Sequence, residues 1–326
     1  MQPEIKSSFN RGWVRWLGTA MATVLFFWLL LRQDWHATWA NLSQLSIGLV
    51  LLALSFYYAG MLANAFRWYI LLKTQVAGIS LVEVIKIVFA GAFVSNFLPS
   101  TVGGDTVRVI SIRRFIADWE VSVASVVIDR LLNVLAMLVT LPFTWITFGA
   151  KILAILKLTS ITGTGLAVQV SAQPVGSGGV WKRSFNRIRR ALALWKSHPW
   201  QLCLAFVIAW LSIFAIFCGV WVIARGLGIH VALYQVMGIN VITYLLTLLP
   251  ISINGYGVRE VAMTALYIQL GATLEQASTL ALITRFFMLL ETLPGAIWLA
   301  QIMPDKSVFK NSGLAPAGPL DPPVIL

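Results

Sequence analysis

An apolar stretch that should continue as a single helix is interrupted near the first third of this chain. Residues 80–98 form an apolar run, and residues 96–114 read NFLPSTVGGDTVRVISIRR. Pro99 lacks a backbone N–H and its ring clashes with the preceding turn, while Gly103 and Gly104 leave the backbone unrestrained. In hydrocarbon, the N–H and C=O groups freed by such a break must be covered by protein or by a water-filled cavity. The break therefore predicts a functional site.

The same interruption occurs again later in the chain. Residues 247–260 read TLLPISINGYGVRE, and both segments fit the pattern P-x-[ST]-[VI]-x-G-x-x-V-R. The similarity extends to flanking dipeptides at nearly equal distances from the two prolines: 78–79 matches 228–229, 129–130 matches 284–285, and 141–142 matches 293–294. Paired interruptions in two halves of a membrane protein indicate a transporter-like binding site at the interface of an inverted repeat. The alignment pairs Pro99 with Pro250, Thr101 with Ser252, Gly104 with Gly255, Val107 with Val258 and Arg108 with Arg259.

The composition places both interruptions in a membrane. The 326 residues are 59% hydrophobic and 11% charged, with a mean hydropathy of +0.83. Such values indicate an integral membrane protein, so the net charge of +12 reports on topology and not on nucleic-acid binding. Cys203, Cys218 and the three histidines show no metal-ligand spacing, and no Walker-type loop occurs. We therefore expect no metal and no cofactor.

The apolar runs predict an all-α polytopic membrane protein with about six transmembrane helices and two re-entrant, broken-helix hairpins in an inverted repeat. The spans expected are 16–31, 47–72, 121–141, a short or tilted span at 143–157, 200–224 and 277–302. The transmembrane domain covers 1–303, with repeat halves at about 47–142 and 200–302, a cytoplasmic basic linker at 158–198 and a disordered tail at 304–326. The hairpins are entered from opposite faces, so their tips meet near the midplane.

Basic residues set the expected orientation. Lys6, Arg11 and Arg15 precede the first span, which places the N-terminus in the cytoplasm and, with this span count, the C-terminus as well. From Lys151 to Lys196 there are eight basic residues and no acidic one. Within that stretch, residues 181–196 predict a basic amphipathic helix on the anionic cytoplasmic leaflet, its apolar stripe being Phe185, Ile188, Leu192 and Trp195.

Charged residues inside apolar segments are costly and are functional candidates. One interpretation is a polar cavity for a charged lipid headgroup, with Arg108 and Arg259 as phosphate-binding forks and hydroxyls at the breaks as further donors. The other is structural pairing, of Asp129 with Arg130 and of Arg285 with Glu291, while Asp105 and Glu260 neutralise the neighbouring arginine. The candidate cavity residues are Ser100, Thr101, Asp105, Arg108, Asp129, Arg130, Ser252, Arg259, Glu260, Arg285 and Glu291.

These motifs resemble the lysylphosphatidylglycerol synthase transmembrane-region family, whose members are also catalogued as flippase-like. The similar segments are NFLPSTVGGDTVRV, LPISINGYGVRE and TRFFMLLETLPG, and the resemblance extends over about residues 10–303. It implies a membrane module that handles lipids. The implied helix breaks are Pro99, Gly103, Gly104, Pro250, Gly255 and Gly257, and the implied site residues are Asp105, Arg108, Arg259 and Glu260 with the cavity charges Asp129, Arg130, Arg285 and Glu291.

We expect a lipid translocase of a bacterial-type inner membrane, which moves a phospholipid or a polyprenyl-linked lipid with an anionic or phosphate-bearing headgroup. We expect no synthase activity, because no soluble aminoacyltransferase domain follows the last span in this sequence. Two alternatives stay open. One is a membrane-embedded transferase using Asp34, and the other is an accessory protein that recruits a soluble lipid transferase through residues 181–196. A second copy of the chain is a further candidate partner.

Overall fold

All the regular structure that is described in this chain is helical. The computed structural model describes residues 43, 45–76, 78–97, 102–116, 118–150, 193–248 and 256–302. Four stretches of these residues are long and apolar enough to cross a membrane: Ile47–Lys73, Trp119–Ala150, Pro199–Gly226 and Leu274–Ile302. The expected all-α membrane fold is confirmed. The predicted first span at 16–31, most of the 158–198 linker and the 304–326 tail lie outside the described residues.

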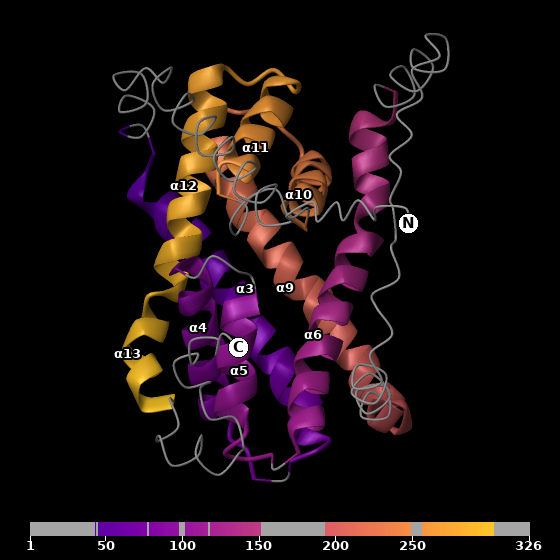
Figure 1. Ribbon diagram of the computed structural model, residues 1–326. Coiled ribbons are helices and arrows are strands. Elements are labelled where there is room, and N and C mark those ends of the chain that lie inside the picture. The colour runs from indigo at the N-terminus through magenta and orange to yellow at the C-terminus, as the bar shows by residue number, and fades with distance from the viewer. Residues whose placement is uncertain are drawn as a thin grey trace, which may run out of the picture.

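The helices occur in the same order twice (Figure 1). The first set is α3 (Ile47–Lys73), α4 (Leu81–Phe97), α5 (Val102–Ile112) and α6 (Trp119–Val139), followed by a helical segment at 141–150. The second set is α9 (Pro199–Gly226), α10 (Leu233–Leu248), α11 (Val258–Ile268), α12 (Leu274–Thr292) and α13 (Pro294–Ile302), with the short 3-10 turn η1 (Leu194–Ser197) before it. Each set thus consists of a long helix, two short ones, and a long helix with a final segment beyond a turn.

The short helices form the two predicted hairpins. α4 and α5 are separated by residues 98–101, and α10 and α11 by residues 249–257. In Figure 1, α4 and α5 lie in the lower half of the molecule and α10 and α11 in the upper half, so the hairpins enter from opposite ends. Pro99, Pro250 and Gly255 lie outside the described residues. Gly103 and Gly104 do not form the break, because both lie inside α5.

Gly104 instead allows the two arms of the first hairpin to pack closely. A Cβ atom at this position would stand 2.3 Å from the carbonyl oxygen of Gly91 in α4 and 1.9 Å from the hydroxyl oxygen of Ser95. The same approach is seen from the other side, where a Cβ on Gly91 would stand 2.9 Å from the Gly104 carbonyl oxygen. The pair of glycines therefore brings the helix backbones together, as small residues do in membrane helix interfaces.

Each set of helices ends on the hairpin of the other set. The 141–150 segment packs on α10, where the Thr144 hydroxyl donates to the Gly238 carbonyl at 3.1 Å. In the second set, α13 packs on α4, with the ring of Trp298 edge-on to that of Phe89 at 5.7 Å. At the centre, α3 and α9 pack against each other, and the Ser212 hydroxyl donates to the Gly60 carbonyl at 2.7 Å.

Two sequence predictions need correction. The chain was expected to turn at Pro142 and cross back over 143–157, but residues 141–150 continue α6 in the same direction after a turn at Thr140 (Figure 1). Pro142 stands in the first turn of this segment, where no backbone N–H is required. Trp195, expected on the membrane surface, is buried and donates its indole N–H to the Leu71 carbonyl at 3.0 Å.

Candidate functional site

A polar cavity of about 490 Å³ lies between the hairpins and the long helices. Its lining comes from α3, α4, α6, α9, α10, α11 and α12, and therefore from both sets of helices. Of the predicted site residues, Arg130, Arg259, Arg285 and Glu291 line it. Its other polar lining residues are Asn64, Ser95, Asn96, Asn133, Ser212, Asn240, Tyr244, Thr247 and Thr292.

Two of the lining arginines are held by equivalent carboxylates behind the cavity wall. Arg130 of α6 donates through Nε to Asp105, which stands in the first turn of α5. Arg285 of α12 donates through Nε to Glu260, in the first turn of α11, at 2.6 Å. In each pair the two residues are 25 positions apart in sequence. The second pair lies 155 positions after the first. A carboxylate in the first turn of a helix is also stabilised by the positive end of the helix dipole.

Glu260 also fixes the end of the second interruption. Its Oε2 accepts the Gly257 N–H at 2.8 Å, and Gly257 has φ +80, a left-handed conformation that favours glycine. The next contact joins the two hairpins, because the Tyr256 hydroxyl donates to the Asn96 carbonyl at the end of α4 at 3.3 Å. The Tyr256 ring lies against the guanidinium of Arg285, with the cation 4.2 Å from the ring centre. The tips of the hairpins therefore meet beside the cavity.

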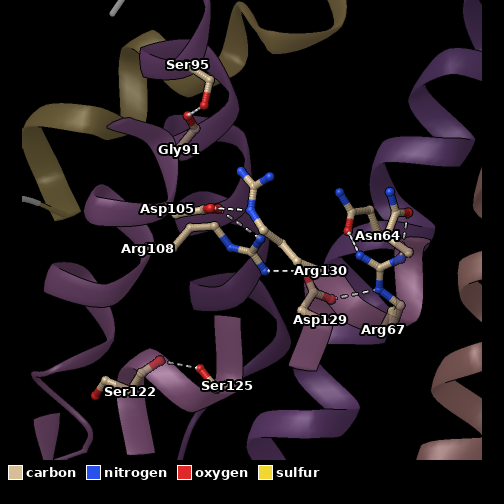
Figure 2. A network of polar contacts seen from close by, with 11 residues as sticks. Asn64, Arg67, Gly91, Ser95, Asp105, Arg108, Ser122, Ser125, Asp129 and Arg130 are labelled. Carbon is tan, nitrogen blue, oxygen red and sulfur yellow. Dashed lines mark hydrogen bonds and ion pairs between the residues drawn. The ribbon is translucent and has the colours of Figure 1, made fainter. Parts of the chain in front are cut away.

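A larger buried network lies on the side of the first hairpin (Figure 2). Asp129 of α6 accepts from Arg67 Nε of α3 at 2.7 Å and from Arg108 Nη2 of α5 at 2.8 Å. Asp129 is 1% exposed, Arg67 2% and Arg108 8%. The guanidinium of Arg108 also stacks on Trp68, 4.2 Å from the ring centre, and lies 3.9 Å from Asp105. One carboxylate thus ties three helices together.

The expected contact of Asp105 with Arg108 is present at 3.9 Å, but the other contacts differ from the ion pairs expected from the sequence. Asp129 does not pair with Arg130, because consecutive residues of a helix point in different directions. Arg285 pairs with Glu260 and not with Glu291, which is six positions away on its own helix and on another face. Arg108 is not among the residues that line the cavity, and in this structure its guanidinium contacts Asp129, Asp105 and Trp68. These contacts give Arg108 a structural role, and its expected role as a phosphate-binding fork stays a prediction.

The alignment of Arg108 with Arg259 is also wrong in structural terms. α5 and α11 have 11 residues each, yet Arg108 is the seventh residue of α5 and Arg259 the second of α11. The physical reason is that the second interruption is longer than the first, so a pattern anchored on Pro99 and Pro250 loses the register of the following helices. The predicted hydroxyl donors Ser100, Thr101 and Ser252 lie outside the described residues.

Arg259 and Glu291 are the lining charges without an ion-pair partner among the described residues. Arg259 contacts the sulfur of Met288, which is only a weak acceptor. Glu291 is 8% exposed, and its Oε2 is buried with no hydrogen-bond partner in the described structure. Arg259 and Glu291 interact electrostatically with each other, but Arg259 has only a weak hydrogen-bond acceptor and Glu291 Oε2 has no hydrogen-bond partner in the described structure, so both side chains can bind a ligand that enters the cavity.

Comparison with known proteins gives the family. A model of the lysylphosphatidylglycerol synthase transmembrane region matches residues 15–295. The chain belongs to this family. It is also similar to a UPF0104 membrane protein of Pyrococcus horikoshii, at 30% identity over 146 residues, which are 43% of this chain and 42% of the relative. The match thus spans less than half of the relative. The family expected from the two interrupted segments is confirmed, and the chain is a multi-pass membrane protein.

Sequence reasoning missed two features of this lysylphosphatidylglycerol synthase transmembrane-region protein. Arg67 lies near the end of the expected span at 47–72, where a basic residue usually marks the membrane interface, but it is buried and central to the network. The asparagines of the cavity were not considered at all. A signal was present, because Asn64 and Arg67, and likewise Asp129 and Asn133, stand about one helical turn apart within apolar runs. Polar residues at such spacing form one polar face on an otherwise apolar helix.

Proposed function

We propose that this protein is a lipid translocase of the cell's inner membrane, with both termini in the cytoplasm. The observation that supports the proposal is the polar cavity between two hairpins entered from opposite ends, with an arginine in its wall that has no carboxylate partner among the described residues. Inverted repeats with binding sites at broken helices are the architecture of many secondary transporters. In this proposal the protein makes and breaks no covalent bond.

Arg259 is proposed to bind the phosphate of a lipid headgroup. A guanidinium offers a planar fork of donors that matches phosphate oxygens, and charge-assisted hydrogen bonds of this kind are stronger than neutral ones. The cavity volume of about 490 Å³ is in the range of sites for small ligands, so it accommodates a headgroup while the acyl or prenyl chains remain in the bilayer.

The helix arrangement supports the proposal that lipid moves between the leaflets through the cavity. Each hairpin is held to its following span by one of the two carboxylate–arginine pairs, and each final segment packs on the opposite hairpin. Rocking of one set of helices against the other would expose the cavity first to one leaflet and then to the other. The lipid is thus the primary partner, and the anionic cytoplasmic leaflet is the proposed partner of residues 181–196.

The test compares two arginine variants in proteoliposomes with a fluorescent anionic phospholipid, using an impermeant quencher to measure transfer between leaflets. Arg259→Ala should lower the transfer rate by about tenfold or more, because the phosphate loses a charged hydrogen-bond partner. Arg225→Ala is the matched control. Arg225 is exposed at the end of α9 and stacks on Trp221, so this variant should transfer lipid at the wild-type rate. A wild-type rate in folded Arg259→Ala protein would contradict the proposal.

A further inference from the structure

The cavity wall contains asparagine side chains from four helices. Asn64 lies on α3, Asn96 on α4, Asn133 on α6 and Asn240 on α10. An amide is poorly soluble in hydrocarbon and requires hydrogen-bond partners when it is removed from water. Two of these amides are oriented by a residue behind the wall, and their orientation restricts which ligand the cavity can bind.

That residue is Arg67. Its Nη2 donates to Asn64 Oδ1 at 2.8 Å and its Nη1 donates to Asn133 Oδ1 at 3.1 Å. A guanidinium has donors only, so the amide oxygen of each asparagine must face Arg67. The NH₂ groups of Asn64 and Asn133 are therefore left as donors at the cavity wall. Arg67 is itself held by Asp129, so the two amides are positioned by a buried and rigid network (Figure 2).

Another part of the cavity wall combines a donor with an acceptor. Arg259 has only the Met288 sulfur as an acceptor, and the buried Oε2 of Glu291 has no hydrogen-bond partner in the described structure. A ligand that satisfies the whole wall must therefore present a strong acceptor to Arg259, further acceptors to the two amide NH₂ groups, and at least one donor to Glu291. Hydroxyl groups meet the last two requirements together, because each hydroxyl both accepts and donates.

We propose that the headgroup is a phosphate ester of a neutral polyol, such as glycerol, inositol or a sugar. The inference rests on the proposed function, since it assigns the substrate class of the same cavity. The phosphate binds Arg259, and the polyol hydroxyls accept from Asn64 and Asn133 and donate to Glu291. An ammonium headgroup fits less well, because an ammonium has donors only and would leave both amide NH₂ groups without acceptors.

The experiment measures binding to the full-length protein in detergent, by competition with a fluorescent phosphatidylglycerol. The competitors share their acyl chains and differ only in headgroup: phosphatidylmethanol, phosphatidylglycerol, phosphatidylinositol and phosphatidylethanolamine. Phosphatidylmethanol has the same charge as phosphatidylglycerol but no hydroxyl. We expect the two polyol lipids to bind at least about tenfold more tightly than phosphatidylmethanol, and phosphatidylethanolamine to bind no more tightly than phosphatidylmethanol.

Two variants assign the selectivity to the cavity. Asn133→Asp keeps an acceptor for Arg67 and removes the NH₂ donor. Glu291→Ala removes a carboxylate whose Oε2 accepts no hydrogen bond in the described structure. Both should reduce the ratio of phosphatidylglycerol to phosphatidylmethanol affinity toward one. An added charge acts equally on two lipids of equal charge, so the ratio reports hydroxyl recognition. In Arg225→Ala the ratio should stay at the wild-type value.

The outcomes separate this inference from the proposed function. Tightest binding of phosphatidylethanolamine, or equal binding of all four lipids, would overturn the polyol assignment even if the protein transfers lipid. An unchanged ratio in both cavity variants would overturn it as well. Polyol-selective binding without transfer in proteoliposomes would instead support the assignment and contradict the translocase.

Discussion

Asp129 is the residue on which the buried charges of the first hairpin depend. It compensates Arg67 and Arg108 at once, and neither arginine has solvent access to replace it. Asp129→Asn keeps the shape of the side chain but leaves two guanidinium groups around a neutral amide. Because removal of one partner of a buried ion pair costs about 3–5 kcal/mol, the variant should unfold at clearly lower temperature or denaturant concentration in detergent. The measurement is the free energy of unfolding.

Asp118→Asn is the matched control for Asp129→Asn. Asp118 precedes α6 on the same segment, is exposed, and makes no side-chain capping hydrogen bond. The same loss of charge there should change stability by less than about 0.5 kcal/mol. If the two variants were equally stable, the buried network would not hold α3, α5 and α6 together.

At the scale of elements, the first hairpin depends on the approach of α4 to α5. Gly104→Ala places a methyl group against the backbone of Gly91, which cannot move without displacing α4. Overpacking of this kind costs about 1–3 kcal/mol, so the melting temperature in detergent should fall. Gly78→Ala is the control, because a Cβ at Gly78 would meet no atom within 4 Å. A melting temperature for Gly104→Ala equal to that of Gly78→Ala would show that the hairpin arms separate freely.

The hairpins also show how far the sequence could predict the elements. The expected spans at 47–72, 121–141, 200–224 and 277–302 and both interruptions were readable, because a run of apolar residues and a proline act locally, whereas the crossing expected at 143–157 was wrong. The pairing of charges was not, because it depends on the angular position of each residue around its helix and on which helices become neighbours. Asp129 and Arg130 are adjacent in sequence, yet their contacts differ. Asp129 pairs with arginines of α3 and α5, whereas Arg130 lines the cavity and pairs with the aspartate at the start of α5.

The same limit applied to the internal repeat. Its existence followed from the two proline-containing motifs, but its register beyond them did not, because the second interruption has a different length from the first. The ion pair of Asp105 with Arg130 is equivalent to that of Glu260 with Arg285, and these two pairs define the correct alignment of the two sets. Arg67 was lost for a similar reason: its position near the end of a span predicts an interface, and only the fold places it against Asp129.

Taken as a whole, the molecule is symmetric in its helices and asymmetric in its charges. When the two sets are aligned by their equivalent ion pairs, which are offset by 155 positions, Asp129 corresponds to Thr284. The second set therefore has no equivalent of the buried carboxylate that pairs with two arginines. In the first set, each charge of the network has an ion-pair partner. The second set leaves Arg259 and Glu291 facing the cavity without ion-pair partners in the described structure. In the proposed function, the first set holds the architecture and the second set supplies the charges that contact the headgroup.

The exchange of final segments makes the two halves stabilise each other. Trp298 belongs to α13 of the second set, yet its ring packs on Phe89 in the hairpin of the first. Trp298→Ala removes this contact between the sets and should lower the free energy of unfolding by about 2–3 kcal/mol, as expected for a partly buried aromatic side chain. The equivalent segment of the first set supplies the control, because Trp145 is 54% exposed and Trp145→Ala should have a much smaller effect. If Trp145→Ala destabilised the protein as much as Trp298→Ala, the aromatic residues would stabilise it through contact with lipid, and the exchange of segments would not unite the two halves.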